Sequence, residues 1–209
     1  RPPRSTLFPY TTLFRSETRT TLEAARTALI GYALSHRDRD GRPYLPCPDQ
    51  PGGDGIEDRL PEGRCAVAVG TLPWHTLGVA ESDAWGNRIA YAVAQQFADA
   101  SHGIIPQPVF ESAIAICQDQ ACAQPLTAAA ALLSHGRNGF GAHNSMGKTN
   151  LGPTSASERA NVDGTPRLIS RPPTAADSPE GEFDDLVTWI SPAWLLGRLC
   201  DPASECAAR

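Results

Sequence analysis

The side chains best suited to holding a metal ion lie in one Gly-rich stretch in the first third of the chain. Four carboxylates fall within ten residues, namely Asp49, Asp54, Glu57 and Asp58. Oxygen ligands this close together suit a hard cation such as calcium, although the spacing is not that of an EF-hand. The alternative is a solvated acidic loop held by the cysteines on either side of it. Calcium is therefore a candidate ligand, and no cofactor is required.

A second acidic pair, Asp184 and Asp185, occurs near the C-terminal end. Adjacent residues of a strand point to opposite faces of the sheet. We therefore expect one of these carboxylates at a turn and the other on an exposed strand face. In that arrangement the pair is neither a set of metal ligands nor a general acid and base.

Ser134 beside His135 is the nearest approach to a nucleophile and its base. Neighbouring strand residues do not form such a pair, because their side chains face opposite sides. The sequence also contains no G-x-S-x-G elbow. We expect His135 to anchor the turn at Gly136 to Gly139 instead, and we predict no catalytic residue and no enzyme.

Gly141 to Thr149 reads GAHNSMGKT and resembles a phosphate-binding P-loop, but five residues separate Gly141 from Gly147 where the motif requires four. We expect an exposed loop with an incidental Lys148. The five histidines lie at unrelated spacings and give no zinc pattern. The formal charge is -5 and no basic stripe is present, so nucleic acid is not an expected partner.

The six cysteines fall into three groups that are local in sequence: Cys47 with Cys65, Cys117 with Cys122, and Cys200 with Cys206. An even count in this arrangement indicates disulfides in an oxidising compartment. Buried free thiols in a cytosolic protein are the alternative, whereas a zinc site would require close Cys-x-x-Cys pairs. Nearest-neighbour pairing is favoured, and the other connectivities stay open.

The first residues, Arg1 to Ser16, resemble a translated short-read sequencing adapter. Thr6 to Ser16 (TLFPYTTLFRS) back-translates to such an adapter without a mismatch. We therefore expect Arg1 to Ser16 to be an adapter-derived artefact without a structural role, and we exclude it from the fold prediction. Residues 17–209 then suit one globular domain, since single domains commonly run to about 100–200 residues.

An amphipathic helix is predicted at the start of this domain. Leu22, Ala25, Leu29 and Ala33 recur at steps of three or four residues, which places them on one face of a helix. We expect a helix over residues 17–36 that is the C-terminal part of a longer one. An acidic Gly/Pro loop over residues 37–69 follows it.

Residues 70–199 are predicted to form a sheet with loops, and residues 200–209 a tail. The candidate strands are Ile89 to Ala94, Ser112 to Cys117, Ala129 to Ser134, Arg167 to Arg171 and Phe183 to Ile190. The Ala-rich segment 129–134 fits a helix equally well. Residues 136–163 are expected to be an exposed, irregular excursion, and Pro192 to Leu199 a short helix. A helix followed by a meander of strands indicates an α+β domain with an antiparallel sheet.

The four tryptophans, Trp74, Trp85, Trp189 and Trp194, each lie among apolar or turn residues. Aromatic residues are enriched at interfaces, but in this setting they are more often part of a core. We expect core positions, with Trp194 as the best candidate for exposure.

Several segments agree, in order, with one group of proteins. ARTALIGYA is followed by LPCPD with a Gly/Asp-rich loop and a second cysteine, then by GTLPWHTLGV and DAWGNRIAYAV, and later by LLSHGRNG, NVDG and EFDDLVTWIS. This series resembles type IV pilin-like proteins and the pseudopilins of type II secretion, which carry prepilin-type cleavage and methylation sites. The resemblance covers most of Glu17 to Leu199, and it depends on the series rather than on any one segment.

The resemblance implies a pilin-like fold whose helix continues upstream into an apolar segment that a prepilin peptidase trims and methylates. It implies a minor pilin or pseudopilin, a structural subunit that is anchored in the inner membrane with its head in the periplasm or outside. Its partners would be other pilin-like subunits and an inner-membrane assembly platform. An apolar helix can serve as membrane span because its backbone groups are paired internally. The alternative is a secreted or periplasmic disulfide-stapled binding module with calcium in its acidic loop.

Overall fold

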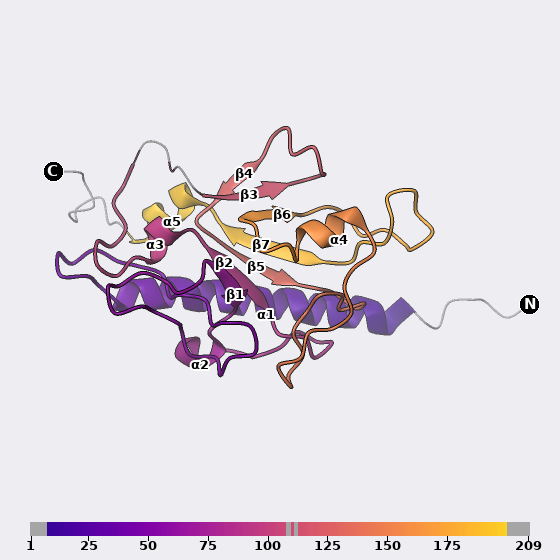
Figure 1. Ribbon diagram of the computed structural model, residues 1–209, viewed down its shortest axis with the longest axis horizontal. Coiled ribbons are helices and arrows are strands. Elements are labelled where there is room, and N and C mark those ends of the chain that lie inside the picture. Colours follow the sequence, from indigo (N-terminus) through magenta and orange to yellow (C-terminus); the bar gives the residue numbers. More distant parts are fainter. Residues whose placement is uncertain (1–7, 108–109, 111–112, 200–209) are drawn as a thin grey trace, which may run out of the picture.

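The computed structural model describes residues 8–107, 110 and 113–199 of the chain. It is an α+β fold, as the sequence predicted, with one long N-terminal helix, α1 (Phe8–Ser35), ahead of short strands and helices (Figure 1). The other elements are, in chain order, β1 (Val69–Thr71), α2 (Trp74–Leu77), β2 (Ala90–Val93), α3 (Gln95–Ala98), β3 (Ile114–Cys117), β4 (Leu126–Ala128), β5 (Ala130–Ser134), α4 (Ala156–Ala160), β6 (Arg167–Ile169), β7 (Leu186–Ile190) and α5 (Pro192–Leu199).

The strands form two sheets. The larger sheet is antiparallel and has the order β1-β2-β5-β7, whereas the smaller sheet has the order β4-β3-β6. In the smaller sheet β3 pairs antiparallel with β4 and parallel with β6. The expectation of one antiparallel sheet is therefore met by the larger sheet, and the smaller one is mixed.

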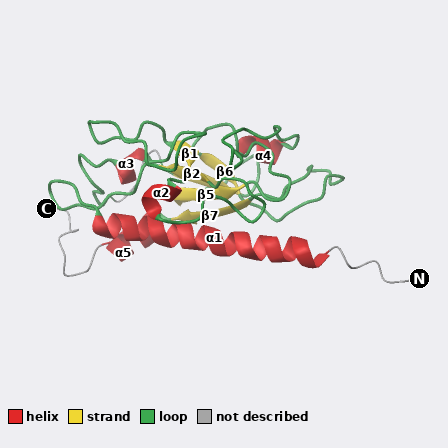
Figure 2. Cartoon of the chain, turned by 90° about the horizontal axis from the view of Figure 1, so that it is seen from below, coloured by secondary structure: helices red, strands yellow, loops and turns green. Residues whose placement is uncertain are grey.

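Helix α1 lies along one face of the larger sheet over the length of the molecule (Figure 2). Its buried positions recur every three or four residues at Leu22, Ala25, Leu29 and Ala33, each at most 2% exposed. These residues belong to the larger hydrophobic core, where α1 packs against β5, β7 and α5. The apolar stripe predicted from the sequence is thus the surface that α1 buries.

The observed helix starts before the predicted one. Helix α1 begins at Phe8 and runs without a break past Glu17 to Ser35, so it includes part of the segment that resembles an adapter. Among the helices that the structure describes, none is both long and apolar enough to span a membrane.

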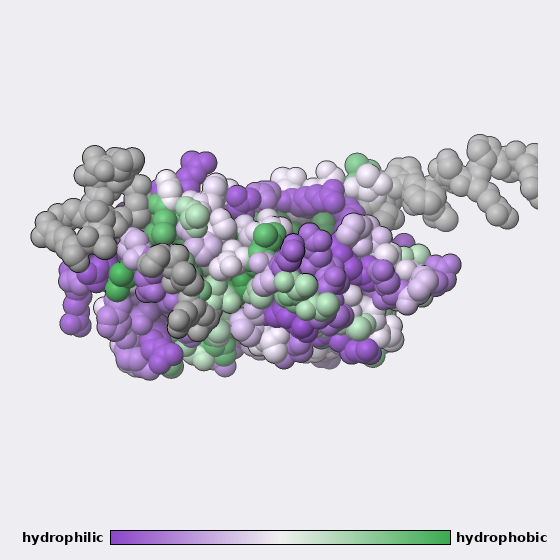
Figure 3. Space-filling view, turned by 90° about the horizontal axis from the view of Figure 1, so that it is seen from above, coloured by the Kyte–Doolittle hydropathy of each residue, from purple (hydrophilic) through white to green (hydrophobic). Residues whose placement is uncertain are grey.

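The opposite face of the larger sheet packs on the smaller sheet. Ala131 and Leu133 of β5 meet Ile114 and Ile116 of β3 in this second core. On the face above β3 and β4, hydrophilic residues predominate and apolar ones form small, separate patches (Figure 3). The fold therefore has three layers, namely α1, the larger sheet and the smaller sheet.

Two expectations about the middle of the chain are settled by packing. Residues 136–163 are not simply an exposed excursion, because they contain α4 and bury Ala142 and Ala160 to 0% and 5% exposure. Ala160 packs there with Phe183 in a third, small core. The ambiguous segment 129–134 is a strand, β5, all of whose residues are buried.

Three of the tryptophans are less buried than expected, and Trp194, the candidate for exposure, is half-buried like the others. Two of them lie beneath a guanidinium group. Arg26 stacks over Trp194 and Arg88 over Trp74, each at 4.4 Å from the ring centroid. A cation over an indole face replaces part of the apolar cover that a core would provide.

Two disulfides join Cys47 to Cys65 and Cys117 to Cys122. This is the nearest-neighbour pairing that the sequence favoured for these four residues. The first bond closes the acidic loop between α1 and β1 and is itself buried, with Cys47 at 0% and Cys65 at 4% exposure. Cys200 and Cys206 lie outside the described residues.

Candidate metal centre

The acidic loop does not gather its carboxylates around one point. Asp49 is 2% exposed, and its Oδ2 accepts a hydrogen bond of 2.8 Å from the N–H of Gly55. Asp54 and Asp58 likewise accept bonds from backbone N–H groups within the loop. The predicted calcium ligands at these positions are therefore acceptors for the loop's own backbone.

Glu57, the fourth carboxylate of the loop, ties three parts of the structure together. It accepts hydrogen bonds from the hydroxyl of Tyr32 at 2.6 Å, the N–H of Cys47 at 2.8 Å and Nη2 of Arg59 at 2.8 Å. Tyr32 belongs to α1 and Cys47 to the first disulfide. Glu57 thus fixes the position of the loop relative to the helix.

A different group of acids does converge. One carboxylate oxygen from each of Glu158, Asp184 and Asp185 lies within 4.8 Å of the others, and no other such group of His, Cys, Asp or Glu occurs in the described part of the chain. Glu158 and Asp185 are 1% and 4% exposed, and Asp184 is half-buried. The expectation of a turn residue and an exposed strand residue at Asp184 and Asp185 is therefore wrong for Asp185.

Local structure explains how Glu158 reaches this group. The side chain of Ser155 caps α4 by accepting a hydrogen bond of 3.2 Å from the N–H of Glu158, a common start for a short helix. The Glu158 side chain then accepts bonds at Oε1 from Nδ2 of Asn138 (2.9 Å) and from the N–H of Asp184 (3.1 Å). Its other oxygen, Oε2, is buried and has no hydrogen-bond partner among the described residues.

The two aspartates repeat this pattern of one bonded and one unbonded oxygen. Asp184 accepts at Oδ2 from the N–H of Asn138 (3.0 Å), and Asp185 accepts at Oδ2 from Nδ2 of Asn161 (2.6 Å). The Oδ1 atoms of both are buried and lack a hydrogen-bond partner in the described residues. A buried polar atom without a partner costs about 1–3 kcal/mol, so three such oxygens together point to a bound group.

The electrostatics of the cluster favour a cation. Burial, reinforced by the charge of Glu158, raises the pKa of Asp184 to about 6. Burial also raises the pKa of Asp185 well above its usual range, and that of Glu158 in the same direction. Buried like charges cannot all ionise without compensation. A hard divalent cation would supply it, and carboxylate oxygens are the ligands that calcium prefers.

His135 borders the cluster as a neutral group. Its Nδ1 lies 3.8 Å from Oδ1 of Asp185 and has no hydrogen-bond partner in the described residues. Burial lowers the pKa of His135 to about 4, so the imidazole adds no positive charge at neutral pH. The carbonyl of His135 accepts the N–H of Gly139 at 3.1 Å, in agreement with its predicted role at this turn.

Ser134 is not paired with His135. Its hydroxyl is fully buried and donates to Oδ2 of Asp83 at 2.6 Å. Ser134 therefore bonds to the turn at Asp83, and not to His135 as a nucleophile would bond to its base.

Sequence reasoning missed Glu158 and the two asparagines that orient the cluster. A signal for Glu158 was present, because Ser155 followed three residues later by a glutamate is the capping-box pattern of a helix start. Nothing in the sequence indicated that α4 would carry this glutamate to the turn before β7. The chain matches no known protein-family model, no curated protein and no solved structure.

Proposed function

We propose that this chain is the head of a minor pilin or pseudopilin, a structural subunit of a type II secretion or type IV pilus-like machine. In this proposal it acts by assembling with other pilin-like subunits on an inner-membrane platform and performs no catalysis. The head lies in the periplasm or outside, and a helix upstream of it anchors the subunit in the inner membrane. The proposal is supported by the ordered series of sequence motifs that resembles this group and by the α+β fold with α1 packed on the larger sheet.

The observation that carries the proposal is the placement of α1. This helix has 28 residues, of which residues 17–35, after the adapter-like segment, span about 28 Å at 1.5 Å per residue, and only one of its faces is buried by the sheet. It runs the length of the head and its N-terminal end lies at one end of the molecule (Figure 1). A helix placed in this way can be extended upstream without disturbing the head.

Two further features are consistent with an envelope protein. The disulfides of the described chain suit an oxidising compartment. The candidate metal centre of Glu158, Asp184 and Asp185 would fasten α4 to the start of β7, and extracellular modules often use calcium in this structural role. Neither feature requires a substrate.

The gene upstream of the codon for Glu17 tests the proposal directly. Long single-molecule reads across this codon should reveal an apolar stretch of about 20 residues that continues α1 and begins with a prepilin-type cleavage site. Coexpression of the restored gene with a prepilin peptidase should then shorten the protein, as measured by intact mass. If Arg1 to Ser16 proves to be the genuine start, the membrane helix that the proposal requires does not precede Glu17, and the proposal is wrong.

The second candidate is a free periplasmic or secreted binding module, and the buried carboxylate cluster is the observation that favours it. The same reads separate the two functions. A cleaved signal peptide followed directly by Glu17 would support the free module.

A further inference from the structure

The larger sheet ends at β7, and the directions of the backbone groups along this edge can be worked out from the neighbouring strands. The N–H of Val93 donates to the carbonyl of Ala68, whereas the N–H of Ala94 donates to the carbonyl of Ala129. Odd-numbered residues of β2 therefore face β1 and even-numbered ones face β5, since backbone groups alternate along a strand. In β5 the residues that face β7 are then Ala130, Leu132 and Ser134.

The register of β5 with β7 leaves two residues facing outward. Leu132 pairs with Thr188, so Thr188 directs its N–H and C=O toward β5. Its neighbours Val187 and Trp189 direct theirs away from the sheet. Within residues 8–107, 110 and 113–199, no group beyond this edge bonds to the backbone of either residue. An edge with unpaired N–H and C=O groups is a template for another strand.

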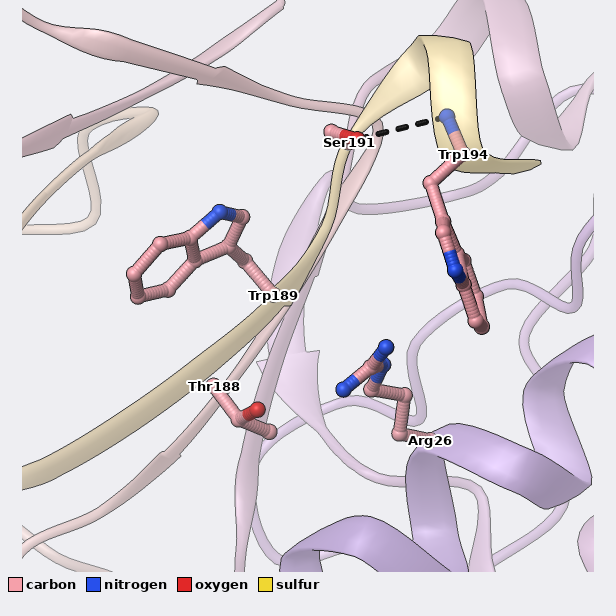
Figure 4. A pocket seen from close by; sticks show the side chains of 5 residues that line it. All are labelled: Arg26, Thr188, Trp189, Ser191 and Trp194. Atoms are coloured by element: carbon pink, nitrogen blue, oxygen red, sulfur yellow. Dashed lines mark hydrogen bonds between the residues drawn. The ribbon is translucent and has the colours of Figure 1, made fainter. Parts of the chain in front are cut away.

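A pocket of about 340 Å³ lies over this edge (Figure 4). Trp189 is on one side of the strand, and Arg26 and Trp194 are on the other. Trp189 packs against the second core, on the face away from α1. Because residues opposite each other on adjacent strands share a face, an added strand would place alternate side chains against Trp189 and against α1.

The α1 side of this edge is cationic. Arg26 binds the carboxylate of Glu23 through Nη1, at 3.0 and 3.2 Å, and its Nε is buried without a hydrogen-bond partner in the described part of the chain. A second pocket continues along β7 and α1 from Thr188. The charged residues that line the two pockets are Arg15, Arg19, Arg26, Arg171, Glu23 and Asp185. Arg15 belongs to the adapter-like segment and Arg171 pairs with Glu180 at 3.2 Å, so neither counts toward the charge that a partner would meet. Asp185 is buried, which leaves Arg19, Arg26 and Glu23 along the groove, an excess of one positive charge although the whole chain is acidic, at -5.

We propose that the edge of β7 binds an extended acidic segment of a partner protein as an added strand. Backbone bonds to Val187 and Trp189 hold the segment, its acidic side chains face Arg19 and Arg26, and its alternate apolar side chains cover Trp189. A second copy of β7 does not fit this edge, because a two-fold pairing would set one row of arginines against another. The inference is independent of the proposed pilin-like function.

The test uses the chain as it stands and a synthetic peptide that alternates glutamate with valine over about eight residues. In the free chain, amide hydrogen exchange should be faster at Val187 and Trp189 than at Thr188. Saturating peptide should slow exchange at Val187 and Trp189 by at least about tenfold. A peptide with lysine in place of glutamate should leave both amides unprotected. Equal binding of the two peptides, or slow exchange of these amides in the free chain, overturns the proposal.

Two variants sharpen the result. Val187→Pro removes an outward N–H that β5 does not use, a substitution that edge strands tolerate, and it should abolish peptide binding. Arg26→Gln should weaken binding by about tenfold, whereas Arg39→Gln, at an exposed residue that lines neither pocket, should not. If Val187→Pro does not fold, the pair Arg26→Gln and Arg39→Gln decides. Equal affinities in those two variants, or dimerisation of the chain through β7 without peptide, refute the acidic partner.

Discussion

Nδ1 of His135 lies 3.8 Å from Oδ1 of Asp185, and both atoms are buried without a hydrogen bond to any residue that the structure describes. Burial lowers the pKa of His135 to about 4 and raises the pKa of Asp185 well above its usual range. At neutral pH the imidazole is therefore neutral, and burial favours the protonated form of the carboxyl group. The two residues form a polar contact and not an ion pair.

The first prediction concerns the charge of His135. Its ring signals in NMR spectra should remain those of a neutral imidazole from pH 8 down to about 5 and change only near pH 4. Because the unfolded histidine takes up its proton near 6.5, this residue makes folding less favourable as the pH falls from 6.5 toward 4. A midpoint near or above 6.5 would contradict the neutral state of His135 and the predicted effect of its burial.

Asp184 should act on stability in the opposite direction. Its pKa rises from 3.8 to about 6 on folding, so between these values the folded state holds a proton that the unfolded state releases. Its contribution to stability is then lost as the pH rises from about 4 to about 6. As the pH rises through this window, Asp184→Asn should become more stable relative to the unmodified chain. Urea unfolding in the presence of a chelator measures the difference.

The control for this comparison is Asp54→Asn, which removes an exposed carboxylate of the acidic loop. It separates the effect at Asp184 from a general effect of lost negative charge. A pH trend of the same size in both variants would contradict the assignment to Asp184.

Calcium should stabilise the fold through the carboxylate cluster. At a free concentration about a hundredfold above the dissociation constant, the free energy of unfolding should rise by about 2.7 kcal/mol. Glu158→Gln and Asp185→Asn should be at least as stable as the unmodified chain in chelator, because each removes a buried carboxylate, but neither should respond to calcium. Thermal melts with and without calcium measure both effects, and the response should weaken below pH 6.

Asp58→Asn is the matched control for the calcium experiment, because it alters the acidic loop and leaves the cluster intact. Loss of the calcium response in Asp58→Asn, with the response retained in Glu158→Gln, would show that calcium binds in the acidic loop and not in the cluster.

Gly136 should be needed for the geometry of the cluster. It has φ of +61°, and a Cβ atom there would collide with the carboxylate and carbonyl of Asp184. Gly164 has φ of +74° with open space around it, so Gly164→Ala reports the cost of backbone strain alone, about 1 kcal/mol. Gly136→Ala should cost more than that in urea unfolding and also weaken calcium binding. Equal effects of the two substitutions would show that Asp184 is not confined by Gly136.

The two disulfides should differ in what they contribute. Cys47 and Cys65 are 18 residues apart, whereas Cys117 and Cys122 are five apart. Loop-closure entropy predicts about 3 kcal/mol for the first bond and about 2 kcal/mol for the second. Replacing each pair by alanines and measuring denaturant midpoints checks this order. A larger loss from the Cys117 and Cys122 pair would show that native packing, not loop length, decides.

The elements with strong periodicity could be read from the sequence. Helix α1 followed from the spacing of Leu22, Ala25, Leu29 and Ala33, and α5 was predicted with the bounds Pro192 to Leu199 that it has. β1 was missed, since three residues around Gly70 carry no alternation. The half-burial of Trp74 was also missed, because its ring is covered by Arg88, which comes from another part of the chain.

The cluster shows a different limit. Asp184 and Asp185 were noted as a pair, but their environment is set by Asn138, Glu158 and Asn161, which lie 23 to 47 residues earlier in the chain. Local sequence patterns predict the backbone conformation of each segment. They do not predict that α4 and the turn at Gly136 meet in front of β7, because this contact depends on how the two sheets pack.

The hydrogen bond between Glu23 and Thr188 joins residues 165 positions apart. Helix α1 is the first element of the described chain, yet β5, β7 and α5, which cover it, all come from its second half. A chain that emerges N-terminal end first therefore exposes the apolar stripe of α1 until strand β7 and helix α5 have been synthesised. Such non-local topology makes folding slow and leaves nascent chains prone to aggregation. A holding chaperone that binds the bare stripe of Leu22, Ala25 and Leu29 would protect the chain over that interval.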